Sequence, residues 1–228
     1  MTAVETWGAE LQPLAPSEWP AYLTAHSGLP GPRANLQLLE AAATVADEAQ
    51  IAALLEDGEE FPAMCAGAAL GRLSADPASE ARARTLAADD RWRVREGVAI
   101  GLQQLGDAAP AALTSVVTRW AGDPDPLVQR AAAAAICEPR LLRTPEAAAV
   151  AVEVCRRSTA HLVALPSERR RDSGVRTLRQ ALGYCWSVAV AADPGPGLVA
   201  FRALDTTDPD VAWIVKQNRS KKRLASLL

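Results

Sequence analysis

Residues 89–107 read DDRWRVREGVAIGLQQLGD, and the spacing of their apolar side chains decides the fold. Four of the apolar positions of this run are Val94, Val98, Leu102 and Leu105. They recur every three or four residues, which is the period of one face of an α-helix. Gly97 and Gly101 lie in the same run, and glycine is a poor helix former. We therefore expect a core helix that another helix approaches closely at these two glycines.

The same pattern returns three times further along the chain. Each copy places a valine in the first turn of a helix and continues with an apolar face; the valines are Val94, Val128, Val175 and Val211. Their spacings are 34, 47 and 36 residues. Two of these spacings fit a repeat of helix pairs, which is about 30–45 residues long. The third fits if one loop is longer, and HLVALPSERRRDS at 161–173 is the expected insertion.

Breaks between the helical segments are regular. Clusters of Pro, Gly and Asp separate segments of about 10–18 residues, which predicts eleven or twelve helices and no strand. Four polar residues precede helical segments and are expected to cap them: Ser17, Asp47, Thr144 and Asp208.

The composition is that of an ordinary globular protein. Of 228 residues, 49% are apolar and 22% are charged, and no apolar run reaches the roughly 18 residues of a membrane span. The first ten residues carry acids and lack the apolar stretch of a signal peptide, so we expect a cytoplasmic protein with no membrane partner. The four cysteines lie in apolar helical segments and form no CxxC pair, which predicts buried, reduced thiols.

The repeated start motif resembles the HEAT family of α-helical repeats. The matching residues are Asp123 to Val128, the run Asp208-Pro-Asp-Val211, and the small-residue face Ala131–Ala135. The resemblance covers about residues 33–224. It implies an all-α fold, a right-handed α-α superhelix (solenoid) of HEAT-like helix pairs with a concave inner surface. We expect residues 1–30 to form an N-terminal capping segment and residues 31–228 to form the repeat array as a single domain.

Charge is divided unevenly along the chain. Residues 1–90 hold 14 acids and 4 bases, a balance of −10, whereas residues 91–228 hold 13 acids and 20 bases, a balance of +7. Such asymmetry favours an anionic partner for the second half. The structural alternative is a solvated surface on which the charges happen to segregate.

Two stretches also resemble the alkylpurine DNA glycosylases built of HEAT-like repeats. They are Asp-x-x-Trp-x-x-Arg, formed by Asp89 or Asp90 with Trp92 and Arg95, and RQALGYCWSVAVAADP at 179–194. The resemblance implies that Asp89 or Asp90 stabilises the charge that develops on the sugar as a base leaves. It also implies that Trp92, Tyr184 and Trp186 offer ring faces to the nucleotide.

Each of these residues also has a purely structural interpretation. Asp89 and Asp90 can cap a helix, and Trp92 and Trp186 can fill the core between helices. One turn before the acids, where this family places a further aromatic residue, the chain has Thr85, Leu86 and Ala87.

Two basic runs supply candidate phosphate or anion contacts. The first contains Arg169, Arg170, Arg171 and Arg176, and the second contains Lys216, Arg219, Lys221, Lys222 and Arg223. Both can instead be solvated segments, the second with cations that favourably follow a helix C-terminus.

Two functions remain open. The favoured one is a non-catalytic scaffold that binds a protein or peptide partner in its concave groove, with Trp92, Arg95, Tyr184 and Trp186 as groove residues. The alternative is a DNA-binding protein of the alkylpurine DNA glycosylase type that releases alkylated bases from duplex DNA. The sequence has no Gly-rich phosphate loop, HExxH motif or GxSxG elbow, so we expect no cofactor and no metal.

Overall fold

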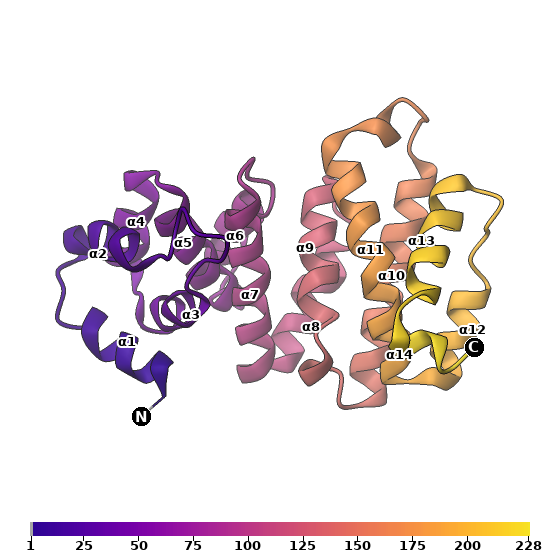
Figure 1. Ribbon diagram of the computed structural model, residues 1–228, viewed down its shortest axis with the longest axis horizontal. Helices are drawn as coiled ribbons and strands as arrows, with labels where there is room; N and C mark the ends of the chain where they lie inside the picture. Colours follow the sequence, from indigo (N-terminus) through magenta and orange to yellow (C-terminus); the bar gives the residue numbers. More distant parts are fainter. Residues whose placement is uncertain (1) are drawn as a thin grey trace. The chain divides into compact units, whose positions relative to one another are not determined.

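A computed structural model of the protein describes residues 2–228 and is all-α over that range (Figure 1). Its α-helices are α1 (Ala3–Leu11), α2 (Trp19–His26), α3 (Leu36–Val45), α4 (Glu48–Asp57), α5 (Glu60–Arg72), α6 (Pro77–Ala87), α7 (Trp92–Ala108), α8 (Pro110–Trp120), α9 (Pro126–Ile136), α10 (Pro145–Ala164), α11 (Ser173–Ala192), α12 (Pro194–Arg202), α13 (Pro209–Arg219) and α14 (Lys222–Ala225). Three short 3-10 helices are η1 (Pro16–Glu18), η2 (Pro139–Leu141) and η3 (Arg169–Arg171).

The all-α prediction is confirmed. The described residues form fourteen α-helices where the sequence predicts eleven or twelve, and one of them, α14, has four residues, too few to produce a period. None of the helices in residues 2–228 has the length and apolar character needed to cross a membrane.

The chain divides into two compact units. Unit 1 is Met1–Ala108 and unit 2 is Ala109–Leu228. Unit 1 has 16 acids and 7 bases, a balance of −9, and unit 2 has 11 acids and 17 bases, a balance of +6. The charge asymmetry of the sequence therefore follows the division into units.

Three of the four predicted helix caps are confirmed. The side chains of Asp47, Thr144 and Asp208 accept hydrogen bonds from the first backbone N–H groups of α4, α10 and α13. The prediction for Ser17 is wrong, because that residue lies inside η1. The carboxylate of Glu18 instead accepts a hydrogen bond from the backbone N–H of Ala15, at 2.7 Å, at the start of that short helix.

In unit 1, α5 is the central helix, and α7 packs against it along its length. A Cβ on Gly97 would lie 2.2 Å from the carbonyl oxygen of Met64, and one on Gly101 would lie 2.0 Å from that of Ala68. The side of α7 that faces α5 must therefore lack side chains at both positions. The close helix approach expected at the two glycines is confirmed.

The first thirty residues pack onto this core. Within them α1 packs against α3, and α2 packs against α4 and α5, with Leu11, Trp19 and Leu23 buried. Met1 lies outside the described residues. That this segment caps the array stays a prediction.

The four repeated valines hold one structural position. Each is the third residue of its helix, in α7, α9, α11 and α13 respectively, and each is buried. The long spacing between Val128 and Val175 arises because α10, with 20 residues, and the 3-10 helices η2 and η3 on either side of it lie between them. The expected insertion at 161–173 is the last turn of α10 followed by the connection that contains η3.

In unit 2, α11 packs against α9, α10 and α13. Asn218 of α13 is fully buried and bridges to α11, donating to the carbonyl of Leu182 at 2.9 Å and accepting from the backbone N–H of Ser187 at 2.8 Å. This bridge fixes the register of α13 on α11.

All four cysteines are buried and none forms a disulfide. The prediction of buried, reduced thiols is confirmed. The Sγ atoms of Cys137 and Cys155 are 3.7 Å apart in the core of unit 2. Within residues 2–228 no group of three or more His, Cys, Asp or Glu residues is arranged to hold a metal ion.

Candidate interaction surface

Asp89, a candidate catalytic acid, is held in a local ion pair. Its carboxylate accepts the backbone N–H of Arg91 at 2.8 Å, and it accepts Nε and Nη2 of the same residue, both at 2.9 Å. Arg91 also donates to the carbonyl of Gly58 at 2.6 Å. The hydrogen bond from the Arg91 side chain, together with that of its backbone, outweighs burial and lowers the pKa of Asp89. Asp89 thus organises the loop before α7.

The other residues predicted around the start of α7 are differently placed. Arg95 donates from Nη1 to the carbonyls of Asp89 and Asp90, at 2.5 and 2.8 Å, so it also closes this loop. The Asp90 side chain is exposed. Trp92 is 56% exposed, so the structural interpretation in which it fills the core is wrong. Its ring instead lies 4.7 Å from the guanidinium carbon of Arg93.

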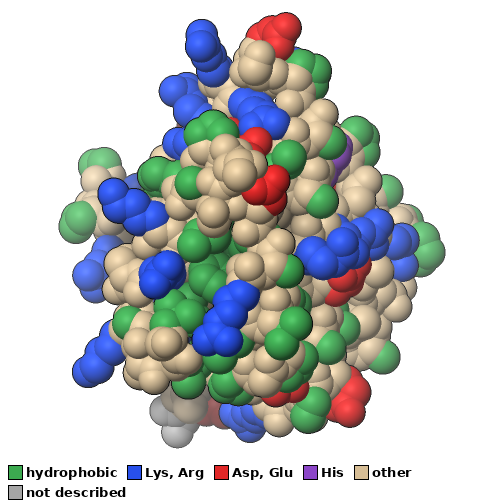
Figure 2. Space-filling model, turned by 90° about the vertical axis from the view of Figure 1, so that its right-hand side faces the viewer, with side chains coloured by type: hydrophobic (Ala, Val, Ile, Leu, Met, Phe, Trp, Pro, Cys, Tyr) green, Lys and Arg blue, Asp and Glu red, His purple; other side chains and the backbone are tan. Residues whose placement is uncertain are grey.

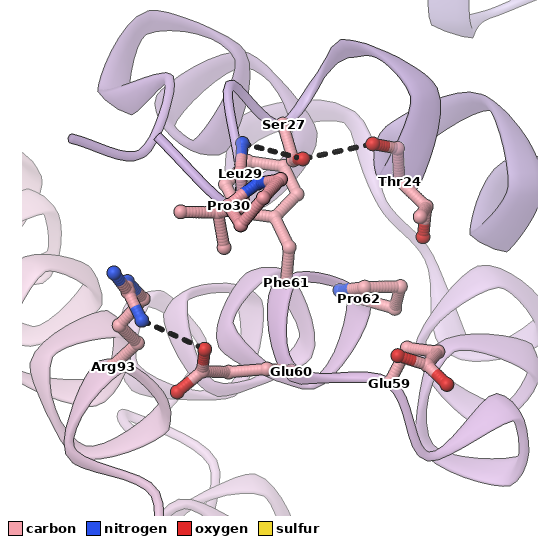
Figure 3. A pocket seen from close by; sticks show the side chains of 9 residues that line it. All are labelled: Thr24, Ser27, Leu29, Pro30, Glu59, Glu60, Phe61, Pro62 and Arg93. Atoms are coloured by element: carbon pink, nitrogen blue, oxygen red, sulfur yellow. Dashed lines mark hydrogen bonds and ion pairs between the residues drawn. The ribbon is translucent and has the colours of Figure 1, made fainter. Parts of the chain in front are cut away.

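Unit 1 also contains a hollow of about 280 Å³ beneath the turn at residues 27–30 (Figure 3). Leu29 and Pro30 approach it from one side and Phe61 from the other, while Arg93 lies at its edge. The one cation here is paired, since Nη1 of Arg93 is 2.8 Å from a carboxylate oxygen of Glu60. None of the predicted site residues lines this hollow.

Trp186, predicted to line a binding groove, is fully buried. Its indole Nε1 donates to Oγ1 of Thr159 at 3.1 Å, and its ring packs 5.8 Å from that of Phe201. The interpretation of Trp186 as a core residue is therefore confirmed, and its assignment to a binding groove is wrong. Burial of so large an aromatic side chain between α10, α11 and α12 instead makes Trp186 a principal part of the core of unit 2.

Tyr184, two residues earlier on α11, is 44% exposed. Its hydroxyl accepts a hydrogen bond from Nη2 of Arg223 at 2.8 Å, and Nζ of Lys221 lies 5.9 Å from its ring centroid. The structure therefore places this ring beside two of the predicted basic residues of the C-terminal run.

The first basic run surrounds a hollow of about 450 Å³ in unit 2. It is lined by Ser167, Arg170, Arg171, Arg176, Arg179, Pro209 and Asp210, which come from the α10–α11 connection, the first two turns of α11 and the start of α13. We call this the arginine hollow. It brings together three of the four arginines predicted from the first run. The fourth, Arg169, turns to Asp172 at 2.7 Å and does not line it.

The four arginines of the hollow fall into two pairs. Arg170 and Arg179 are held by acids, Arg170 to Asp208 at 2.5 Å and Arg179 to Asp210 at 2.7 Å. Arg170 also donates to the carbonyls of Val163 and Leu165, which ties down the connection. The side chains of Arg171 and Arg176 are exposed and have no ion pair or hydrogen bond with any residue that the structure describes. Two guanidinium groups are therefore fixed and two are available.

One flank of α11 joins the arginine hollow to Tyr184. Arg176, Gln180 and Tyr184 are exposed and spaced four residues apart, so they follow one side of the helix. In Figure 1 this helix runs from the connection that contains η3 down to α14. We call the arginine hollow, Gln180, Tyr184, Lys221 and Arg223 together the basic surface. Eight residues of α-helix place its two ends ~12 Å apart.

Other predicted cations lie off this surface. Lys216 is exposed on α13, and Lys222 lies on an open hollow with Lys221 and Arg223. Arg219 lines a further hollow of about 310 Å³ with Phe201 and Val215. Figure 2 shows Lys and Arg side chains spread over one side of unit 2, with several gathered at the top, the level of the α10–α11 connection in Figure 1.

Arg179 and Gln180 are two members of the basic surface that sequence reasoning missed. The signal was present, since Arg179 lies three residues after Arg176 and Gln180 lies four after it. These are the spacings of neighbours on a helix face. Ser167, also missed, lies in the insertion between two helices, where no period exists to place it.

Residues 48–137 match the family model for HEAT repeats. This part of the chain consists of HEAT repeats. Neither the search of curated proteins nor that of solved structures returned a match.

Two loops of the matched stretch are closed by the same kind of hydrogen bond, which Arg176 does not make. In the matched stretch, the residue after the valine folds back onto the preceding loop. Arg95 donates to the carbonyl of Asp89 at 2.5 Å, and Gln129 donates to that of Asp123 at 2.6 Å. Arg176 follows Val175 in the same way, yet its guanidinium makes no such bond with any described residue. The guanidinium of Arg176 therefore closes no loop of this kind.

Proposed function

We propose that the chain is a non-catalytic helical-repeat scaffold that binds a protein or peptide partner, and that an acidic segment of the partner docks on the basic surface. HEAT-type helix pairs stack into arrays that present an extended concave groove. In this proposal, the flank of α11 forms part of that groove.

The availability of Arg171 and Arg176 carries the proposal. They lie beside Arg170 and Arg179, which are already fixed by Asp208 and Asp210. Arginine and tyrosine are enriched among the residues that dominate protein interfaces, because each offers a large contact area and directional hydrogen bonds. The basic surface contains four arginines in its hollow and Tyr184 at its other end.

Duplex DNA is the alternative partner. The observation that favours it is Tyr184, an exposed ring with Lys221 and Arg223 beside it, a combination that can stack a base and hold phosphates. Base release would require an acid, and Asp89 is engaged by Arg91. Asp90 would then have to stabilise the charge on the sugar.

Fluorescence anisotropy separates the two partners. One probe is a labelled ten-residue peptide rich in Asp and Glu, and the other is a labelled duplex of similar charge, each titrated at low salt and at about 200 mM. The test variant is Arg171→Gln/Arg176→Gln. Arg202→Gln is the matched control, since Arg202 is exposed on α12 and lies outside the basic surface.

The proposal expects peptide binding that weakens at least ~10-fold in the double variant and is unchanged in the control, because each guanidinium–carboxylate contact is worth about 1 kcal/mol or more at an interface. Duplex binding that falls steeply with salt, with base release from alkylated DNA abolished by Asp90→Asn, would instead establish the alternative. Equal peptide affinity in wild type, Arg171→Gln/Arg176→Gln and Arg202→Gln would show that the basic surface does not bind the peptide.

A further inference from the structure

We infer that the arginine hollow receives a phosphate group on a serine or threonine of the partner. This inference rests on the proposed function, because it names the feature of the partner that the basic surface recognises.

Charge is the first argument. The hollow has four arginines, and two acids, Asp208 and Asp210, are paired with two of them. Glu168 accepts the Ser167 hydroxyl at 3.2 Å and is not part of the lining. An excess of two positive charges remains on Arg171 and Arg176. A phosphorylated serine or threonine carries about −1.5 to −2 at pH 7, whereas a carboxylate carries −1.

The fixed arginines supply the second argument. Arg179 is held both by Asp210 and by the ring of Trp213, whose centroid lies 4.6 Å from its guanidinium carbon. Arg170 is held by Asp208 and by two carbonyls of the connection. These contacts keep two guanidinium groups in place before any ligand arrives, which lowers the entropy cost of binding. Arg171 and Arg176 can then close on the phosphate oxygens with bidentate hydrogen bonds.

The distance along α11 sets the spacing of a second contact. Arg176 and Tyr184 are separated by eight residues, or ~12 Å of helix. An extended peptide advances ~3.3 Å per residue, so the partner residue that reaches Lys221 and Arg223 lies about four positions from the phosphorylated one. Because Lys221 and Arg223 are cations beside Tyr184, that second residue should be acidic.

A phosphodiester backbone fits the hollow less well. Each DNA phosphate carries one charge and the next lies along a continuous track, whereas the excess charge here is gathered in one hollow of about 450 Å³. The structure therefore favours a single phosphate monoester, and DNA becomes an outcome of the test.

The experiment uses a positional peptide library with a central phosphoserine and one Glu placed at each flanking position in turn, measured by fluorescence anisotropy against the full chain. Matched peptides carry serine or Glu in place of phosphoserine. Phosphoserine should bind at least ~10-fold more tightly than serine and more tightly than Glu, with the best flanking Glu about four positions away. Inorganic phosphate should compete.

Two variants locate the effect. Arg171→Gln/Arg176→Gln should remove the preference for phosphoserine, and Arg176→Lys should weaken it because lysine keeps the charge without the bidentate geometry. Arg169→Gln is the control, because Arg169 lies in the same connection but outside the hollow. Circular dichroism melting curves should coincide for all of these, since the substituted side chains are exposed.

The outcomes are distinguishable. Equal affinity for the phosphoserine and serine peptides overturns the phosphate inference and leaves the scaffold proposal standing. Failure of every acidic peptide to bind counts against the scaffold proposal itself. Binding of duplex DNA that is lost in Arg171→Gln/Arg176→Gln, without peptide binding, assigns the hollow to nucleic acid and overturns the inference.

Discussion

A Cβ on Gly101 would lie 2.0 Å from the carbonyl oxygen of Ala68, so these two residues hold α7 and α5 in backbone contact. Gly101→Ala must push the helices apart along their whole crossing. Overpacking of a tight core costs about 1–3 kcal/mol, and here the opposing atoms are backbone and cannot rotate away. We expect the free energy of unfolding in urea to fall by at least ~2 kcal/mol.

Gly195→Ala is the matched control for this helix crossing. Gly195 lies in the first turn of α12, and a Cβ there would meet nothing within 4 Å. The same chemical change should leave stability unchanged or raise it by about 0.4–1 kcal/mol, because alanine restricts the unfolded chain. Equal losses for the two variants would contradict the account of the α5–α7 crossing.

Asp89 should contribute to acid unfolding. The Arg91 side chain is the main cause of its lowered pKa, so the stability that the ionised carboxylate supplies is fully present above its unfolded pKa of about 3.9 and is lost as pH falls through the folded value. Asp89→Asn should lower the melting temperature at pH 7, and its gap to wild type should narrow as the pH falls below the unfolded pKa of about 3.9. A gap that stays constant with pH would show that the ion pair with Arg91 contributes little.

Asn218 should be costly to remove. Asn218→Ala leaves the backbone N–H of Ser187 and the carbonyl of Leu182 without their side-chain partner inside the core. Leaving buried polar groups unpaired costs about 1–3 kcal/mol each. Urea unfolding should show a loss of ~2 kcal/mol or more, whereas Lys216→Ala, an exposed position on the same helix, should change stability by less than about 0.5 kcal/mol.

The four cysteine thiols should be unreactive in the native protein. Burial raises the pKa of the Cys65 thiol, and its sulfur is shielded from solvent. The thiolate is the reactive form, so an aromatic disulfide reagent should titrate no thiol at pH 8 in the folded state. It should titrate all four cysteines in denaturant. Rapid reaction of one thiol in the native state would contradict the packing of its helix.

Neighbouring arginines of the α10–α11 connection should differ in their effect on stability. Arg170→Gln breaks an ion pair with Asp208 and two bonds to carbonyls, so the melting temperature should fall by several degrees. Arg171→Gln removes an exposed side chain without a partner among the described residues and should leave the melting temperature unchanged. Equal losses in the two variants would show that Arg171 has a structural role, and it would then be unavailable to a ligand.

The repeat architecture could be predicted because it has a period. The four valines fix the third position of α7, α9, α11 and α13, and the glycines of α7 mark its crossing with α5. The prediction that Ser17 caps a helix was wrong because a serine before a proline-containing segment can also lie within a 3-10 turn, as it does in η1. Local signals locate helix starts but do not decide between neighbouring turns.

The candidate surface could be predicted only in part. The sequence shows where the arginines are but not which acid each one pairs with. Arg170, for example, pairs with Asp208, which lies 38 residues away in sequence. The sequence allowed a core position for both Trp92 and Trp186, yet one is 56% exposed and the other is fully buried. Only the packing of α10 and α12 around α11 distinguishes their roles.

The most direct test of the basic surface is a photo-crosslinking amino acid at Gln180, in the centre of the exposed flank of α11, introduced in the cells that make this protein. Ala149, exposed on α10, is the control position. The account predicts a protein adduct from position 180 that is absent from position 149 and that is lost in Arg171→Gln/Arg176→Gln. Nucleic-acid adducts from position 180, or the same adducts from both positions, would contradict it.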